Sequence, residues 1–242
     1  MVSAEPGGQP VALVSGSRGG IGRHIVDALA GQGMLVVGLD RDGDEALGEI
    51  RGDVSVTADC DAAVAEVVRR HGRLDVVVAA AGINLRQAFE SLDMDKARAL
   101  FDVNVWGTAA LLRAAYPPLS KSPQAAAVVL TSISGELGFR NSSVYAMSKM
   151  ALTALVRCLA VEWSSYPIRV NAVAPAMVET AMNAEVRQIE GYLENKRAGI
   201  PLGRTIRATE VAAAVAFLAG PGGSGITGEV LHVDGGSVIA GR

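Results

Sequence analysis

The chain has 242 residues and a formal net charge of −3, from 22 Lys and Arg against 25 Asp and Glu. Half of the residues are hydrophobic and only 19% are charged, which excludes an intrinsically disordered chain. Because there is no basic excess, a general nucleic-acid-binding or membrane-binding surface is not expected.

The apolar runs, the N-terminus and the cysteines bear on the compartment of the protein. The longest unbroken apolar run, 211–219, is too short to span a bilayer. The N-terminal stretch has neither the basic region nor the apolar core of a secretion signal. Cys60 and Cys158 lie in segments that are predicted to be helical, so a disulfide framework is not expected. These features predict a cytoplasmic protein.

Apolar runs rich in β-branched residues alternate along the chain with segments of helical periodicity. The runs predicted to be strands are 11–14, 35–39, 76–81, 128–130, 168–173 and 230–233. After the first run, Ile21, Ile25 and Leu29 share one helical face. A second helix is predicted over 59–70, with Gly72 as its C-cap.

Strands that alternate with helices predict right-handed crossovers and a parallel sheet covered on both faces. We therefore expect one α/β domain over residues 1–242, with an N-terminal tail over 1–9. Its fold is predicted to be a Rossmann-type, doubly wound parallel sheet of about seven strands with helices on both faces. In such sheets, ligands bind beyond the carboxyl ends of the strands.

The first predicted strand leads into a glycine-rich turn, Ser-Gly-Ser-Arg-Gly-Gly-Ile-Gly over 15–22, and a helix follows. Glycines at 16, 20 and 22 allow the backbone to turn sharply and to approach a pyrophosphate closely. The free N–H groups of the new helix then face the phosphates. A glycine-rich turn without a ligand is the alternative. The strand before it and the helix after it favour dinucleotide binding.

An acidic residue closes the next predicted strand. Asp40 lies 18 residues after Gly22, close to the spacing of a carboxylate that accepts hydrogen bonds from the adenosine ribose. A carboxylate there repels a 2′-phosphate, so Asp40 favours NAD over NADP. A solvated turn aspartate is the alternative. Arg18 and Arg41 leave NADP open, because either has the charge to contact a 2′-phosphate.

Tyr145 and Lys149 lie four residues apart in a predicted helix, and therefore on the same helical face. A neighbouring ammonium group is expected to lower the pKa of the phenol, which would let Tyr145 exchange a proton with a substrate oxygen. A Tyr–Lys pair on a surface helix is the alternative. Ser132 follows the strand at 128–130, where a parallel sheet places its ligand, and its hydroxyl is placed to bind the same oxygen.

Together these motifs resemble the short-chain dehydrogenase/reductase family from residue 11 to residue 236. The glycine turn, Ser132, Tyr145 and Lys149 match the family in order and spacing, and Asn104 matches its remaining catalytic position. The resemblance implies direct transfer of a hydride between a substrate carbon and the nicotinamide, with Tyr145 as the general acid/base. It also implies that Lys149 binds the nicotinamide ribose and that Asn104 bends its helix.

The resemblance implies a set of cofactor contacts that runs along the carboxyl edge of the sheet. These contacts are Gly16, Ser17, Arg18, Gly20, Ile21, Gly22, Asp40, Asp53, Val54, Ala80, Ala81, Gly82, Asn104, Tyr145, Lys149, Pro175, Val178 and Thr180. NAD is the expected cofactor and NADP the less favoured one. No metal is expected, because the three histidines lack ligand spacing.

The chain departs from the family pattern at two places. The sequence Ala-Ala-Ala-Gly over 79–82 replaces the frequent Asn-Asn-Ala-Gly, which removes a side chain that helps to fix the adenosine side of the site. Asp40 and Asp53 are separated by only 12 residues, so the helix usually found between them is expected to be lost or reduced to a turn.

Substrate choice is expected to rest on a mobile helical lid over 180–207, which includes Arg187 and Lys196. The candidate pocket residues are Asn84, Leu137, Phe139, Met177, Met182 and Tyr192. They suit a small, cyclic or dihydrodiol-type secondary alcohol or its ketone. The enzymatic alternative is an NADPH-dependent reductase that resembles 3-oxoacyl-[acyl-carrier-protein] reductase, and the non-enzyme alternative is a dinucleotide-binding regulatory protein. The family resemblance also implies a homotetramer or dimer.

Overall fold

The computed structural model of the protein describes residues 8–241, and the side chains of residues 183, 186 and 187 fall outside that description. Most of the predicted N-terminal tail over 1–9 therefore lies outside the described residues. The described chain folds around one parallel sheet in the order β3-β2-β1-β4-β5-β6-β7. This confirms the predicted Rossmann-type sheet. The strands are Val11–Ser15 (β1), Leu35–Asp40 (β2), Ile50–Arg51 (β3), Val76–Ala79 (β4), Ala125–Leu130 (β5), Ile168–Pro175 (β6) and Val230–Val233 (β7).

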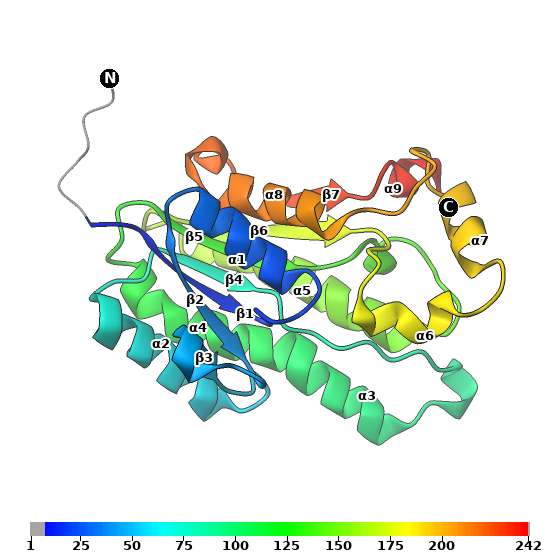
Figure 1. Cartoon of the computed structure of the whole chain (residues 1–242), viewed down its shortest axis with the longest axis horizontal. Helices are drawn as coiled ribbons and strands as arrows, with labels where there is room; N and C mark the ends of the chain where they lie inside the picture. The colour runs from blue at the N-terminus through cyan, green and yellow to red at the C-terminus, as the bar shows by residue number, and fades with distance from the viewer. Residues whose placement is uncertain (1–7, 242) are drawn as a thin grey trace.

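Helices cover both faces of this sheet (Figure 1). One face packs against α1 (Gly22–Gly31) and α8 (Ala208–Ala219). The other packs against α2 (Thr57–His71), α4 (Thr108–Leu119) and α5 (Ser143–Glu162). Alternate strand residues enter the two cores: Leu13 faces the α2 side and Val14 the α1 side. Both side chains are fully buried, as a parallel sheet between two helical layers requires.

The remaining helices frame the carboxyl ends of the strands. Helix α3 (Met94–Phe101) leads into α4, while α6 (Ala184–Arg187), α7 (Tyr192–Ala198) and α9 (Ser237–Ala240) lie together at the right of Figure 1. The predicted loss of a helix between Asp40 and Asp53 is confirmed, because that link holds only a 3-10 turn, Glu45–Leu47, and the two-residue strand β3.

Several predicted boundaries needed correction. The run 76–81 stops being a strand at Ala79, because the backbone N–H groups of Ala80 and Ala81 turn to the Ser15 hydroxyl. The run 168–173 continues as a strand to Pro175, paired with β7. The predicted second helix extends over all of α2 and ends at Gly72, whose φ of 72° is the expected left-handed cap.

Helix α5 is long and apolar enough, by length and composition, to cross a membrane. In the structure, Leu152 and Val156 of this helix are buried in the core against the sheet, and its first two turns carry Tyr145 and Lys149. Packing against the sheet thus accounts for the apolar character of its inner face.

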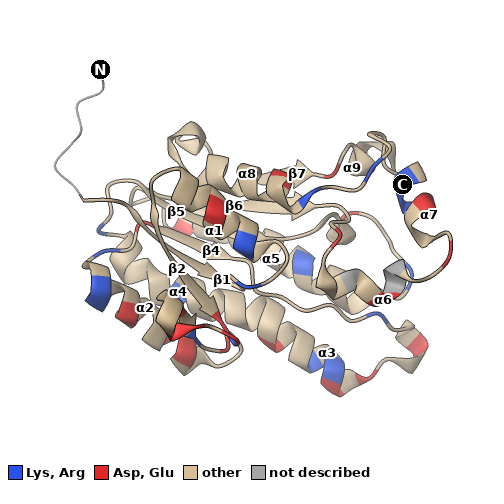
Figure 2. Cartoon of the chain, viewed as in Figure 1, with Lys and Arg blue, Asp and Glu red and all other residues tan. Residues whose placement is uncertain are grey.

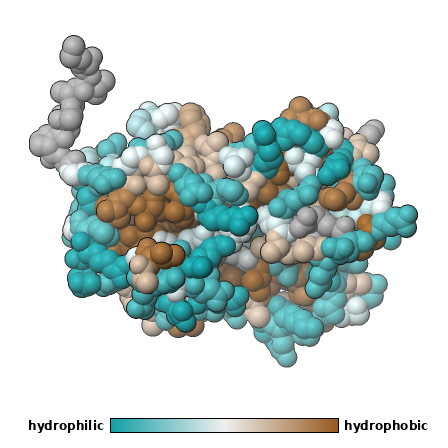
Figure 3. Space-filling model, viewed as in Figure 1, coloured by the Kyte–Doolittle hydropathy of each residue, from teal (hydrophilic) through white to brown (hydrophobic). Residues whose placement is uncertain are grey.

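Polar residues cover most of the face seen in Figure 3, and apolar residues show mainly beside α1 and β2 and beside α6 and α7.

Asp75 ties three strands together at the amino edge of the sheet. Its carboxylate accepts hydrogen bonds from the Val11 N–H (2.8 Å), the Ser122 hydroxyl (2.6 Å) and the Arg73 guanidinium (2.8 Å). The side chain is 1% exposed. Burial by itself raises the pKa of this carboxyl, but the hydrogen bonds from Arg73, Ser122 and Val11 outweigh it, so the pKa lies below its ordinary value.

We predict that Asp75→Asn lowers the free energy of unfolding by about 3 kcal/mol at pH 7, because Arg73 loses a buried anionic partner. Asp61→Asn is the matched control. Asp61 pairs with Arg113 on the surface, and its loss should cost less than about 1 kcal/mol. Urea unfolding measures both.

The same measurement has a pH test. A carboxyl whose pKa is lowered by folding stabilises the protein above its unfolded pKa, and that contribution is lost as the pH falls below about 4. The difference in the free energy of unfolding between wild type and Asp75→Asn should therefore become smaller as the pH falls below about 4. Equal losses for both variants at pH 7 would contradict the role given to Asp75.

Candidate active site

The turn between β1 and α1 leaves its backbone bare. Gly16 has a φ of 66°, and a Cβ there would lie 2.8 Å from the backbone of Ala81. A Cβ on Gly22 would lie 1.9 Å from the Gly16 carbonyl oxygen, and one on Gly20 would strike Thr180. No side chain caps the first turn of α1. Glycine therefore lets this turn pack directly against its own backbone, against Ala81 and against Thr180, and the helix that follows has no side-chain cap. A tight glycine turn before a helix N-terminus is the arrangement that suits the pyrophosphate of a dinucleotide.

Acidic residues surround the loop after β2, and they appear as the red cluster beside β3 in Figure 2. Asp40 Oδ2 accepts a hydrogen bond from the Arg18 N–H (3.0 Å), and Asp40 Oδ1 accepts one from the Asp42 N–H (3.2 Å). The Asp40 carboxylate thus lies at the glycine turn, as the sequence predicts. Its position matches that of a ribose-binding carboxylate.

Glu49 is a second acid at this end of the site, and sequence reasoning missed it. Its carboxylate lies 2.8 Å from Nη1 of Arg18 and accepts a hydrogen bond from the Asp44 N–H (2.9 Å). The sequence held one signal, since Glu49 directly precedes β3, but no spacing rule connects it to Arg18. The pairing means that the guanidinium of Arg18 is already bound to an anion.

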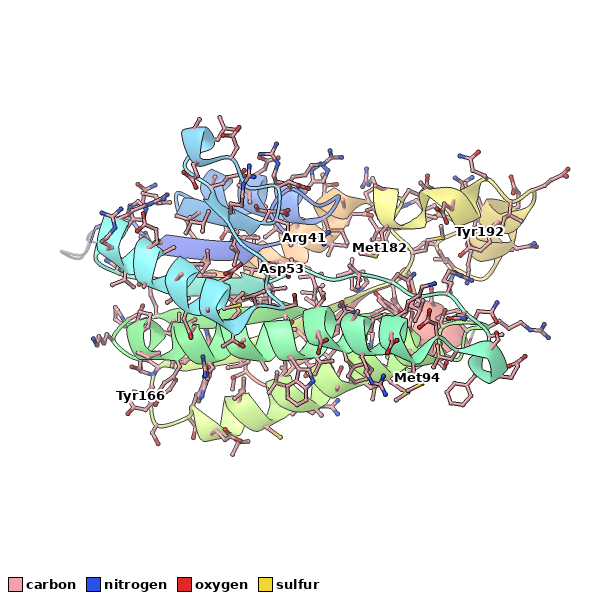
Figure 4. The ribbon with its side chains drawn as sticks, turned by 90° about the horizontal axis from the view of Figure 1, so that it is seen from below. Arg41, Asp53, Met94, Tyr166, Met182 and Tyr192 are labelled. Atoms are coloured by element: carbon pink, nitrogen blue, oxygen red, sulfur yellow. The ribbon has the colours of Figure 1, made fainter. Side chains whose placement is uncertain are left out.

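Asp53 and Val54 follow β3. Asp53 Oδ1 accepts hydrogen bonds from the Ser55 N–H (2.9 Å) and hydroxyl (2.7 Å). Burial raises the pKa of this carboxyl. The hydrogen bonds from Ser55 and the charge of Arg41 together have the larger, opposite effect, so the pKa lies below its ordinary value. Figure 4 shows Arg41 and Asp53 near each other on this side of the sheet. Val54, the residue after Asp53, is buried and packs against Gly107.

Asn104 lies in a π-helical turn, Asp102–Gly107, which joins α3 to α4. This wider turn confirms the expected distortion of the helix at Asn104. The buried side chain accepts a hydrogen bond from the Ile83 N–H (2.8 Å) and donates to the Ile83 carbonyl (3.0 Å) and the Ser148 hydroxyl (3.2 Å). Asn104 therefore fixes the segment after β4 to the helix that carries Tyr145.

Ser132, Tyr145 and Lys149 meet beyond the carboxyl end of β5. Lys149 Nζ donates to the Leu130 carbonyl (2.8 Å) and lies 5.7 Å from the centre of the Tyr145 ring. Burial raises the pKa of the Tyr145 phenol, and a hydrogen bond with Ser132 opposes that rise. Burial also lowers the pKa of the Lys149 ammonium group from its ordinary 10.5 to about 8.

The expected lowering of the phenol pKa by Lys149 is wrong for the chain alone. The ammonium group is directed to the Leu130 carbonyl, and burial dominates the phenol, so Tyr145 keeps its proton at neutral pH. A protonated phenol beside the Ser132 hydroxyl is a proton donor for a carbonyl oxygen.

These groups open into a cavity of about 400 Å³. The predicted site residues that line it are Ile21, Ala80, Gly82, Asn84, Ser132, Phe139, Tyr145, Lys149, Pro175, Met177, Val178, Thr180, Met182 and Tyr192. Leu137 does not line it, and Asn104 lies behind it. Residues that sequence reasoning missed include Arg86, Ser142, Asn195 and Ser237, which share no spacing pattern because four different segments supply them.

The predicted lid over 180–207 forms one wall of this cavity through Thr180, Met182, residues of α7 and the two residues after it, Gly199 and Ile200. A β-bridge between Val178 and Ile206 joins its two ends. Figure 4 shows Met182 and Tyr192 on this wall. The side chain of Arg187, which we placed in the lid, lies outside the described residues. In the part of the chain that the structure describes, no group of three or more His, Cys, Asp or Glu has the arrangement to hold a metal ion.

Comparisons with known proteins agree with this geometry. A family model described as "Enoyl-(Acyl carrier protein) reductase" matches residues 16–238. Trans-4-hydroxycyclohexanecarboxylate dehydrogenase of Sinomonas cyclohexanicum is 34% identical over 94% of this chain and 92% of its own length. The 3-oxoacyl-[acyl-carrier-protein] reductase FabG of Escherichia coli is 31% identical over 93% of this chain and 96% of its own. A gluconate 5-dehydrogenase from Burkholderia cenocepacia, solved with NADP and tartrate, is 27% identical with a TM-score of 0.90, over 95% of each chain.

We predict that Lys149→Met makes the cofactor-free protein more stable than wild type at pH 7, because the buried ammonium group is a cost of folding. A lysine whose pKa is lowered by folding destabilises the protein below that pKa, and stability rises with pH between the folded and unfolded pKa values. The advantage of the variant in Tm should therefore fall by roughly 5 °C between pH 8 and pH 10. Thermal unfolding followed by circular dichroism measures this difference.

Lys121→Met, at an exposed position, is the control and should show no such trend. A difference in Tm between Lys149→Met and wild type that does not change with pH would show that the ammonium group is not desolvated.

Proposed function

We propose that this chain, which belongs to the short-chain dehydrogenase/reductase family, uses NAD to interconvert a small cyclic secondary alcohol and its ketone. The family match and the relatives make it an alcohol dehydrogenase or ketoreductase of the short-chain type. The observation that carries the proposal is the convergence of Ser132, Tyr145 and Lys149 on one cavity beside the bare glycine turn.

In the proposed reaction, the Tyr145 hydroxyl gives its proton to the oxygen of a ketone, and in the reverse direction its phenolate takes the proton of an alcohol. The Ser132 hydroxyl donates a hydrogen bond to the same oxygen and holds it near the phenol. Lys149 supplies positive charge near the Tyr145 ring. When bound, the nicotinamide supplies or accepts the hydride. The glycine turn would hold the pyrophosphate, Asp40 the adenosine ribose, Asp53 and Val54 the adenine, and Lys149 the nicotinamide ribose.

The lining of the cavity supports a compact and largely apolar substrate. Phe139, Met177 and Met182 supply apolar surface, and Asn84 adds a polar group at one side. The relative from Sinomonas cyclohexanicum is named for a substituted cyclohexanol, which fits a cavity of this size. A dihydrodiol would present the same ring and hydroxyl chemistry.

A 3-oxoacyl thioester is the alternative substrate, favoured by the similarity to FabG. Wild-type turnover with NADH separates the two, using cyclohexanone, 4-oxocyclohexanecarboxylate and its carboxamide against acetoacetyl-coenzyme A. Faster turnover of the thioester, or a preference for NADPH, would contradict the proposal.

Support for NAD comes from the charges at the adenosine end. A 2′-phosphate would lie close to the Asp40 carboxylate, and the Arg18 guanidinium that has the charge to bind it is held by Glu49. Repulsion at one group and prior pairing at the other both disfavour NADP.

An assembly of two or four copies is part of the proposal. Trp106, in the π-helical turn before α4, and Met150 and Val161 of α5 are exposed apolar side chains. The π-helical turn that carries Trp106 packs against α5. A second copy of the chain would remove these side chains from water.

We predict that Tyr145→Phe lowers kcat by roughly 100- to 10,000-fold, because the ring loses the hydroxyl that exchanges the proton. The dissociation constant for NADH, measured by fluorescence, should stay within about twofold, since the change removes one oxygen atom. Unaltered turnover in the variant would refute the role of Tyr145. NADH binding without turnover of any of these compounds by the wild type would instead favour a dinucleotide-binding regulatory protein.

We predict that Glu49→Gln tightens NADPH binding by about tenfold while NADH binding changes little, because Arg18 is released to pair with the 2′-phosphate. Asp40→Ala should shift the preference in the same direction. Glu45→Gln removes an acid from the same loop that forms no ion pair in the described structure, and it serves as the control. Fluorescence titration with both dinucleotides measures the ratio. An equal effect of Glu45→Gln and Glu49→Gln would show a general charge effect rather than the release of Arg18.

A further inference from the structure

Among the side chains that the structure describes, three cations and no carboxylate line the cavity. Lys149 belongs to the group around Tyr145, but Arg86 and Lys196 have no part in the proposed proton transfer. Arg86 follows β4 by a few residues, and Lys196 lies on α7 in the lid. Two basic side chains from distant segments are thus placed on one wall of the substrate cavity.

Arg86 is held in place by an aromatic side chain. Its Nη1 donates a hydrogen bond to the Tyr192 hydroxyl (3.1 Å), and its Cζ lies 5.8 Å from the centre of the Tyr192 ring. Figure 4 shows Tyr192 on α7 at the edge of the site. No ion pair with a carboxylate involves Arg86 within residues 8–241, as far as their side chains are described. Its remaining guanidinium N–H groups are free to bind a ligand.

Lys196 is a half-buried ammonium group without an acidic partner in the described structure. Its Nζ lies 4.3 Å from the centre of the Phe139 ring and 5.9 Å from that of Tyr192. Burial, and then the nearby charge of Arg86, lower the pKa of this group. The next residue, Arg197, shows the contrast, because it pairs with Glu179 at 3.4 Å.

Two cations near the same aromatic ring repel each other and lose hydration, so this arrangement is costly in the absence of an anion. A carboxylate between them would neutralise the charge and accept several charge-assisted hydrogen bonds, and the planar guanidinium of Arg86 suits a two-point contact. Asn84 and Asn195 line the same cavity and have amide N–H groups to add.

We propose that Arg86 and Lys196 form an anion subsite that binds a carboxylate group on the substrate, at the wall of the cavity formed by α7. This inference rests on the proposed function, because it places the alcohol or ketone at Tyr145 and the carboxylate of the same molecule at α7. The substrate class is therefore a cyclic hydroxy or oxo acid.

Calorimetric binding to the NADH-saturated protein tests the subsite without turnover. The probes are cyclohexanecarboxylate and cyclohexanecarboxamide, which have the same ring and no reacting group. Wild type should bind the carboxylate at least tenfold more tightly than the amide. Lys196→Gln and Arg86→Gln should each lose about tenfold in carboxylate affinity and leave amide affinity unchanged.

Arg197→Gln is the matched control, since it removes a charge from the same helix outside the cavity lining. An equal loss in this variant would overturn the subsite by showing a diffuse electrostatic effect. A larger dissociation constant for NADH in the Lys196 or Arg86 variants would also overturn the subsite, because it would show that these cations bind the cofactor phosphates.

Kinetics with 4-oxocyclohexanecarboxylate and its carboxamide separates the subsite from the proposed function. Both subsite variants should raise KM for the acid about tenfold with kcat unchanged, and leave the KM for the amide as it was. If both ketones are turned over with the same KM, the anion subsite is contradicted and the proposed function stands. Tight binding of cyclohexanecarboxylate that depends on Lys196, without turnover of any ketone, would support the anion subsite and contradict the proposed function.

Discussion

The buried ammonium group of Lys149 is the constraint on which the rest of the site depends. The Lys149 side chain is only 5% exposed, and its hydrogen bond to the Leu130 carbonyl attaches α5 to the end of β5. Together with the core packing of Leu152 and Val156, this contact sets the helix so that Tyr145, one turn before Lys149, lines the same cavity as Ser132. The charge is costly to bury, and the pKa near 8 expresses that cost. Burying Lys149 thus lowers the free energy of unfolding at a residue that the proposed reaction requires.

The ends of the site carry opposite charge, and each end selects a different part of the ligands. Asp40, Glu49 and Asp53 lie at the adenosine end, whereas Arg86, Lys149 and Lys196 line the cavity at the other. Under the proposed function, the acidic end would disfavour an extra phosphate on the ribose, and the basic end would favour an anionic group on the substrate. The net charge of −3 does not reveal this division, because it is a sum over the whole chain.

The fold and the reacting groups were predictable because they rest on local signals. Buried parallel strands give continuous apolar runs, the glycine turn is contiguous, and Tyr145 and Lys149 are four residues apart. Strand β3 was not predictable, since two residues have no periodicity. Glu49 and Arg86 were missed, and Lys196 was assigned only to the lid, for another reason. Their roles depend on pairs that are brought together from distant segments, and no spacing in the chain encodes them.

The start of the lid couples the two ends of the site. Thr180 packs so closely on Gly20 that a single methyl group at Gly20 would displace it. The neighbouring Val178 is bridged to Ile206, so both ends of the lid are joined beside the glycine turn. The dinucleotide that we propose for the turn would therefore lie beside the segment that leads into α7 and the cavity wall. Because α7 carries Lys196 and Tyr192, a shift of Thr180 caused by the proposed pyrophosphate would reach the cationic wall along the chain between Thr180 and Lys196 rather than through the sheet.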